Sequence, residues 1–139
     1  MIRPARPGDA DEVAALLEDL GHPTGVDEVR VRIERFRDDR TTGVLVYAQN
    51  GHAVGVAAYT AVPLFERPAA QCRLTTLVVA PGHRRRGIAR ALVRAVEEHA
   101  RELGCFRIEV TTRPTRPEAT PFYLGIGFEE RPRRLVKPL

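Results

Sequence analysis

The chain has 139 residues, of which 43% are hydrophobic and 29% are charged. This is the size and composition of one ordinary globular domain, so we expect a single domain over residues 1–139 rather than a disordered or fibrous chain. No apolar run approaches the roughly 20 residues that span a bilayer, and no apolar signal segment opens the chain. These absences predict a cytoplasmic protein with no membrane partner.

The basic excess consists almost wholly of arginine. The formal net charge is +4, and Lys137 is the only lysine. Arginine keeps its charge and presents a planar fork of donors that suits phosphate oxygens. Such an excess fits either nucleic acid or an anionic cofactor, but the chain lacks the aromatic-rich and zinc-finger patterns of nucleic-acid-binding domains. We therefore expect an anionic cofactor and no nucleic-acid partner.

The cysteines and histidines form no metal-binding pattern. Cys72 and Cys105 lack CxxC spacing, and the four histidines are scattered without an HExxH pair. A zinc site needs several such ligands at close spacing. We therefore predict no metal and two free thiols.

The first third of the chain predicts one short strand and two helices. Residues 2–5 are expected to form the strand, and acidic residues after Gly8 mark the start of a helix. Apolar residues then recur at helical spacing until Gly21, which ends this helix. A second apolar stripe with the same period predicts another helix over 26–36.

A β-hairpin is expected next. β-Branched residues predict strands over 44–48 and 53–62, and Asn50-Gly51 between them is the strongest short turn signal in the sequence. Gly55, inside the second strand, indicates either a bulge or the close approach of another segment. The turn makes the two strands antiparallel neighbours.

The second half of the chain predicts a strand–helix–strand unit. Strands over 73–79 and 105–112 flank the longest helix, 87–103. Such a connection is right-handed by default and makes the two strands parallel. A short helix over 118–124 and a final strand over 127–132 complete the chain. This order predicts an α+β fold with a mixed, mostly antiparallel central sheet and helices on both faces.

The segment from the third of these strands into the long helix carries the most chemical information. An apolar strand ends at Val79, a basic turn follows, and a long helix begins at Gly87. The first N–H groups of a helix lack internal partners, and the helix dipole adds positive charge, so this end suits a phosphate. Gly87 lacks the Cβ that would block a close approach. The segment is neither a P-loop nor a dinucleotide fingerprint, because GxxxxGK(S/T) and GxGxxG are both absent.

Residues 84–89, Arg-Arg-Arg-Gly-Ile-Ala, resemble the (Q/R)xxGx(G/A) motif of the GNAT acetyltransferases. Residues 119–128 are similar to the closing AxxFYxxxGF signature of that family. Residues 2–5, together with Asp9, resemble its opening strand and first helix. These matches follow the family's order and extend over nearly the whole chain.

The resemblance implies the acyl-CoA N-acyltransferase fold, in which a bulge splays strand 73–79 from its parallel neighbour 105–112 and opens a cleft. It implies that acetyl-CoA binds there, with the pyrophosphate on the basic turn and the pantetheine arm along the preceding strand. The implied cofactor-binding residues are Leu77, Val78, Val79, Arg84, Arg85, Arg86, Gly87, Ile88, Ala89 and Arg90.

The resemblance also implies an N-acetyltransferase in which an amine attacks acetyl-CoA directly within a ternary complex. Tyr123 occupies the position of the family's tyrosine and is the implied general acid. A phenol with an ordinary pKa near 10 stays protonated at neutral pH and can donate to a leaving thiolate. A backbone N–H of strand 77–79 is expected to stabilise the oxyanion.

The general base stays open. Many members of the family carry a carboxylate on the strand before the turn, whereas residues 74–77 of this strand read Leu-Thr-Thr-Leu. Glu109, Glu66 and His83 are candidates, and a water chain or an amine of low pKa would need no dedicated base. Arg116 stands where many members have asparagine. It is expected either to contact the cofactor or an acidic substrate group, or to be an ordinary loop residue.

The acceptor is expected to be a small-molecule or peptide amine held by the segment between the first two helices. His22 and Thr24 in this segment, together with Glu109, are the candidate substrate residues. The sequence leaves open the identity of the amine and of the acyl group, and also a homodimer, which is frequent in the family. The alternative to an enzyme is a non-catalytic acyl-CoA-binding module on the same fold, which would suit the missing strand carboxylate.

Overall fold

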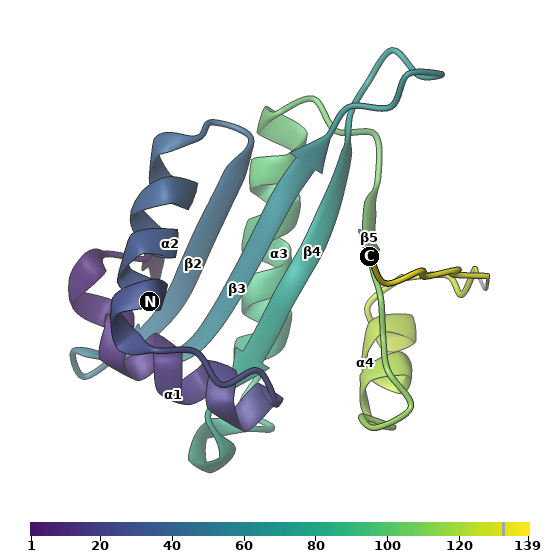
Figure 1. Cartoon of the computed structure of the whole chain (residues 1–139). Helices are drawn as coiled ribbons and strands as arrows, with labels where there is room; N and C mark the ends of the chain where they lie inside the picture. The colour runs from purple at the N-terminus through teal and green to yellow at the C-terminus, as the bar shows by residue number, and fades with distance from the viewer. Residues whose placement is uncertain (132) are drawn as a thin grey trace.

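The protein, described by a computed structural model over residues 1–131 and 133–139, is built around one five-stranded sheet. The strands follow one another in sequence order across the sheet, and neighbours are antiparallel except for the last pair, which is parallel (Figure 1). The strands are β1 (Ile2–Pro4), β2 (Thr42–Gln49), β3 (His52–Val62), β4 (Gln71–Val79) and β5 (Ile108–Val110).

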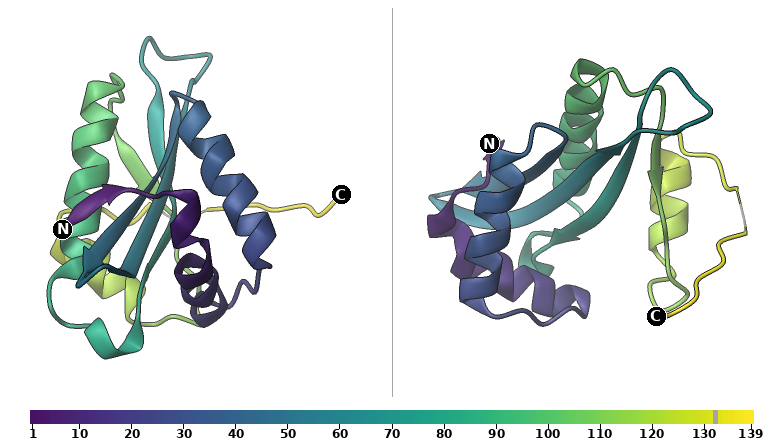
Figure 2. Two further views of the ribbon diagram at one scale, coloured as in Figure 1. Left: turned by 90° about the vertical axis from the view of Figure 1, so that its left-hand side faces the viewer. Right: turned by 45° about the horizontal axis from the view of Figure 1, so that its top comes forward.

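Helices cover both faces of this sheet. Two of them pack on one face, the longest lies on the other face, and the last stands beside β5 (Figure 2). Among the described residues, no helix combines the length and the apolar character needed to cross a membrane. The helices are α1 (Ala10–Leu20), α2 (Val26–Asp38), α3 (Ile88–Glu102) and α4 (Ala119–Gly125), with short 3₁₀ turns η1 (Pro7–Asp9) and η2 (Pro81–His83).

Strand residues alternate between two hydrophobic cores, because successive side chains of a strand point to opposite faces. In β3, Val56 packs in the core beneath α1 and α2, whereas its neighbour Ala57 packs in the core beneath α3. Leu92, Val93 and Val96 of α3 are each at most 1% exposed. The α+β prediction, with a mixed sheet buried on both faces, is therefore confirmed.

One extra residue interrupts the sheet at β4. The register between β3 and β4 shifts between Ala58 and Tyr59, which leaves Thr75 of β4 without a partner in β3. Pairing between β4 and β5 ends at the preceding residue, Leu74. The two strands then diverge (Figure 1), so the splayed parallel pair is confirmed. The strand expected over 105–112 is only three residues long, and the divergence accounts for its early end at Val110.

The predicted final strand over 127–132 is wrong over its described part, since residues 127–131 form no strand; its last residue lies outside the described residues. Instead, the chain folds back onto α4. The N–H of Phe128 donates to the carbonyl oxygen of Tyr123 at 3.0 Å, and the two rings pack edge to face with centroids 5.1 Å apart. Phe128 thus contacts α4 instead of extending the sheet.

Gly55 lies where α3 comes closest to β3. A Cβ at this position would lie 3.1 Å from both Ile88 Cγ2 and Leu92 Cδ1, two buried side chains of α3. The register between β2 and β3 also shifts beside Gly55, leaving Val54 unpaired. Both alternatives that the sequence left open at this glycine are therefore present: a neighbouring bulge and a close approach.

Replacing Gly55 with alanine is expected to lower the free energy of unfolding by about 1–3 kcal/mol, because neither α3 side chain has room to retreat. Urea unfolding followed by circular dichroism would measure this. The control is Gly8→Ala, where an added Cβ meets nothing within 4 Å; its effect is expected to stay within about 0.5 kcal/mol. Equal values for the two variants would mean that α3 can shift away from β3.

Candidate functional site

The first turn of α3 presents unpaired backbone N–H groups at the end of β4. Gly87 caps the helix with a left-handed φ of 78°, and Arg85, two residues earlier, has a φ of 64°. Within the described residues, no backbone acceptor pairs with the N–H groups of Ile88, Ala89 and Arg90. These groups point out of the helix end, where the dipole adds positive charge. The turn is therefore a ready anion site.

The surroundings of this helix end leave room for a phosphate. A Cβ on Gly87 would meet nothing within 4 Å, so the space above the turn is open. Arg85, Arg86 and Arg90 are exposed around it. The side chain of Ile88 is buried in the core beneath α3, so this residue can offer only its N–H. A diphosphate group fits this chemistry, which combines backbone donors with free guanidinium groups.

Arg84, the first residue of the motif, is bound to the protein itself. Its Nε donates to the carbonyl oxygen of Val79 at 3.1 Å, and its Nη2 contacts a carboxylate oxygen of Asp19 at 2.5 Å. Arg84 thus ties the turn to the end of β4 and to α1. Sequence reasoning missed Asp19, because nothing in the local pattern links two residues 65 positions apart.

The backbone of β4 is left partly unpaired beside this turn. The N–H of Ala80 donates to the carbonyl oxygen of Val54 in β3. The backbone groups of successive residues in an antiparallel strand point to opposite sides, so the N–H and C=O of Val78, two residues earlier, also point toward β3. Leu77 and Val79 consequently direct their N–H and C=O groups to the other side, where β5 has departed. Val78 was predicted to bind the cofactor, but its backbone groups point away from the gap. Its side chain lies in the core beneath α1 and α2.

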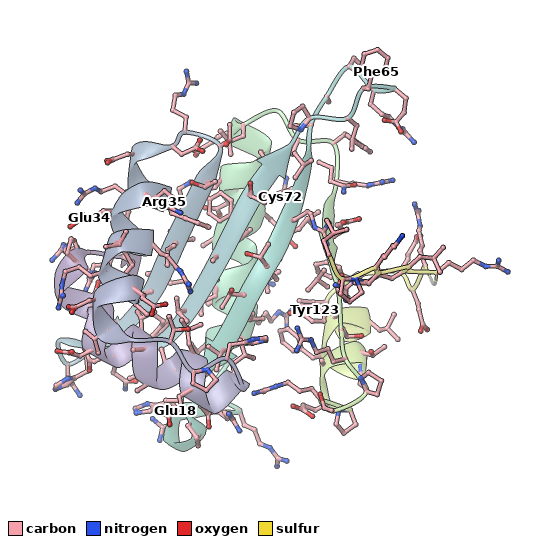
Figure 3. The ribbon with its side chains drawn as sticks, in the orientation of Figure 1. Glu18, Glu34, Arg35, Phe65, Cys72 and Tyr123 are labelled. Carbon is pink, nitrogen blue, oxygen red and sulfur yellow. The ribbon has the colours of Figure 1, made fainter. Side chains whose placement is uncertain are left out.

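A cavity of about 680 Å³ lies between this stretch of β4, the α1–α2 connection and the segment from β5 to α4. Leu77 and Tyr123 line it, as do His22 and Thr24, the two substrate candidates of the α1–α2 connection. Figure 3 shows Tyr123 on the side of α4 that faces β4. The cavity thus brings residues from opposite ends of the chain together at the splayed strands.

Tyr123 is held in the cavity wall by aromatic packing. Its ring lies edge to face with Phe122 and Phe128, with centroids 5.0 and 5.1 Å away. The residue is 8% exposed, and this burial raises the pKa of Tyr123 to about 12. The hydroxyl is consequently protonated throughout the neutral range and remains a hydrogen donor.

Arg116 bridges the two sides of the cavity at its base. Its Nη2 donates to the backbone carbonyl oxygen of Asp19, at the C-terminal end of α1, at 2.9 Å. A guanidinium at this end of a helix is also favoured by the helix dipole. Arg116 therefore connects the β5–α4 segment to α1 and still lines the cavity.

The three candidate general bases lie in three different places. Glu109 pairs with Arg73 of β4 at 3.3 Å, Glu66 lies in the loop between β3 and β4, and His83 lines a second cavity of about 440 Å³. In the part of the chain that the structure describes, no carboxylate lines the larger cavity. The lining of the cavity that contains Tyr123, as far as described residues form it, therefore includes none of the three candidates.

The raised pKa of Tyr123 predicts a change in stability at high pH. Between the ordinary value of 10.0 and about 12, the unfolded chain ionises this phenol while the folded chain keeps it protonated, so stability falls as the pH rises. Wild-type protein is expected to lose about 2–3 kcal/mol more than Tyr123→Phe across this window. Urea unfolding of both proteins at the two ends of this pH window would measure the difference. Equal losses in the free energy of unfolding would mean that the hydroxyl of Tyr123 is exposed to water.

Comparisons with known proteins agree with this geometry. The model of the acetyltransferase (GNAT) family matches residues 12–128. N-acetyltransferase 8B of Rattus norvegicus is 37% identical over 97 residues, which are 68% of this chain and 43% of that protein. Glucosamine 6-phosphate N-acetyltransferase of Trypanosoma brucei brucei is 28% identical over 134 residues, 91% of this chain and 89% of that protein. The chain thus spans less than half the length of the rat relatives that it matches.

Solved structures share the whole architecture. A protein described as a transcriptional regulator from Bacillus halodurans C-125 aligns over 100% of this chain and 99% of its own, with a TM-score of 0.90 and 27% identity. An aminoglycoside N-acetyltransferase solved in complex with CoA aligns over 100% of this chain and 93% of its own, with a TM-score of 0.88 and 20% identity, which shows a common fold. From the family match over most of its length, and from the strands that splay beside an anion-binding helix end, this chain belongs to the acetyltransferase (GNAT) family.

Proposed function

We propose that the protein is an acetyl-CoA-dependent N-acetyltransferase that acts on a small-molecule or peptide amine in a ternary complex. The observation that carries this proposal is the position of a protonated tyrosine, Tyr123, in a cavity that continues along the unpaired edge of β4. Relatives named as N-acetyltransferases support the reaction. A neighbour of the same fold that was solved with CoA supports the cofactor.

The turn and the strand edge would hold acetyl-CoA. The N–H groups of residues 88–90, with the exposed guanidinium groups beside them, suit its diphosphate. The backbone N–H and C=O of Leu77 and the N–H of Val79 suit the amide groups of its pantetheine arm, as one strand pairs with another, whereas the carbonyl oxygen of Val79 already accepts from Arg84. Arg84 acts indirectly, by holding the turn against β4 and α1.

Acetyl-CoA supplies the acetyl group as a thioester: in the net reaction the amine nitrogen bonds to the acetyl carbon, the carbon–sulfur bond breaks, one proton leaves the amine and one reaches the sulfur. Tyr123 holds a proton at Oη and delivers it to the departing sulfur. The N–H of Leu77, which faces the gap and lines the same cavity, stabilises negative charge on the carbonyl oxygen. The described lining contains no carboxylate, so the proton of the amine passes to water or to the imidazole of His22, which lines the same cavity.

Gly87→Glu is expected to weaken acetyl-CoA binding at least about 100-fold, because a carboxylate would occupy the open space above the turn. Calorimetric titration of acetyl-CoA would measure the affinity. The matched control is Gly104→Glu at the other end of α3, where the glycine has a φ of 76° and equally open surroundings. The control carries the same charge and similar backbone strain, so unchanged affinity in both variants would exclude the turn as the diphosphate site.

Tyr123→Phe is expected to lower kcat at least about 100-fold with little change in the Kd of acetyl-CoA, because the variant lacks only the donated proton. Release of free thiol in the presence of an amine panel would measure kcat. Tyr59→Phe is the control, since Tyr59 is also buried but stacks on His99 outside this cavity. Turnover equal to wild type in Tyr123→Phe would remove this hydroxyl from the reaction.

The second candidate function is a non-catalytic acyl-CoA-binding module. The observation that favours it is the lack of a carboxylate in the described lining of the cavity. The same two experiments separate the candidates: saturable acetyl-CoA binding without thiol release on any amine supports the module. Thiol release that depends on Tyr123 supports the enzyme.

A further inference from the structure

We propose that the acceptor is an amine that also carries an anionic group, either a phosphate or a carboxylate. The inference rests on the proposed function, because it concerns the half of the cavity that acetyl-CoA leaves to the second substrate. It depends on the arginines that line the cavity as a whole, which come from several elements and are far apart in the sequence. The lining includes five arginines, Arg32, Arg73, Arg113, Arg116 and Arg134, and within the described residues no aspartate or glutamate.

Three of these arginines have a carboxylate partner, and each partner lies outside the lining. Arg73 pairs with Glu109 at 3.3 Å, Arg32 of α2 with Glu28 at 3.4 Å, and Arg116 with Glu118 at 3.9 Å. These arginines line the cavity, whereas their carboxylate partners do not. A ligand inside the cavity would therefore contact the positive member of each pair.

The other two arginines, Arg113 and Arg134, have no carboxylate within 4 Å in the described part of the chain. Five positive charges against three carboxylates leave the cavity wall with an uncompensated positive charge. Water screens part of this charge because the cavity is open to solvent. The remaining field still favours an anion and opposes a polycation.

A positive wall also explains how the site works without a general base. Only a neutral amine attacks a thioester, and nearby positive charge lowers the pKa of an ammonium group. An anionic group elsewhere on the same molecule would bind the arginines, through the paired donors of a guanidinium fork. The same charges would thus anchor the acceptor by its anion and release the proton of its amine.

The acceptor alternatives differ in their fit to this wall. A polyamine or an aminoglycoside would bring only positive charge into a positive cavity. A neutral amine would gain nothing from the arginines. The acceptor would share a cavity of about 680 Å³ with the acetyl end of acetyl-CoA, so a compact amine with one phosphate or carboxylate suits both the remaining space and the charge.

The test compares matched amines that differ only in the anion. Glucosamine 6-phosphate against glucosamine is the phosphate arm, and phenylalanine against phenylalaninamide is the carboxylate arm. Each is titrated calorimetrically into protein saturated with CoA, so that the diphosphate site is already filled. In at least one arm the anionic member is expected to bind at least about tenfold more tightly, and more weakly as salt rises. The responding arm identifies the anion.

Arginine variants locate the effect. Arg113→Gln is expected to weaken binding of the anionic amine about tenfold and to leave both its uncharged counterpart and CoA unaffected. The control is Arg101→Gln on α3, an exposed arginine outside the cavity lining, which is expected to change nothing. If Arg101→Gln weakened binding of the anionic amine as much as Arg113→Gln does, the preference would come only from the net charge of the protein. This result would overturn the proposal.

The proposal is overturned if neither anionic amine binds more tightly than its uncharged counterpart. This result is distinct from failure of the proposed function. That function fails if acetyl-CoA does not bind, or if no amine releases thiol, whereas the preference for an anion is read from binding alone. The kcat/KM ratio within each pair then tells whether the preferred amine is also the one that reacts.

Discussion

An extra residue in β4 is the constraint on which the site depends. Thr75 has no partner in β3, and pairing of β4 with β5 stops one residue earlier. A continuous parallel ladder would satisfy the backbone of Leu77 and Val79 and would leave no space between the strands. Because the ladder ends, these groups have no strand partner on that side, although Arg84 occupies the carbonyl oxygen of Val79, and the gap opens into the cavity that contains Tyr123. The bulge thus leaves part of the sheet edge without a strand partner beside the cavity.

The rest of the fold keeps that surface in place. The close approach of α3 at Gly55 fixes the helix against β3, and with it the unpaired N–H groups of its first turn. Asp19 at the end of α1 accepts Arg84 through its carboxylate and Arg116 through its backbone. A single helix end is therefore linked to both the anion-binding turn and the cavity base, which lie far apart in the sequence.

The electrostatics of the cavity support the transfer of an acyl group to a neutral amine. Burial keeps the phenol of Tyr123 protonated, with a pKa of about 12, so that it can only donate at neutral pH. The arginines in the wall would lower the pKa of an ammonium group nearby, since positive charge favours the neutral amine. In the proposed reaction, each effect would favour the protonation state that the group needs, and neither involves a carboxylate in the cavity.

Local sequence patterns predicted most of the elements and the chemistry of single segments. Apolar periodicity gave the helices and strands, the basic turn before Gly87 predicted an anion site, and Tyr123 was identified within a family signature. The prediction of a final strand failed at residues 127–131, because the contact of Phe128 with Tyr123 depends on a neighbour in space rather than on local preference. Which residues share the cavity depends on how the chain folds. The ion pair of Asp19 with Arg84, and the arginines gathered from α2, β4 and the β5–α4 segment, join positions that no local pattern relates. Charges act through space, so their combined effect appears only when the chain is folded.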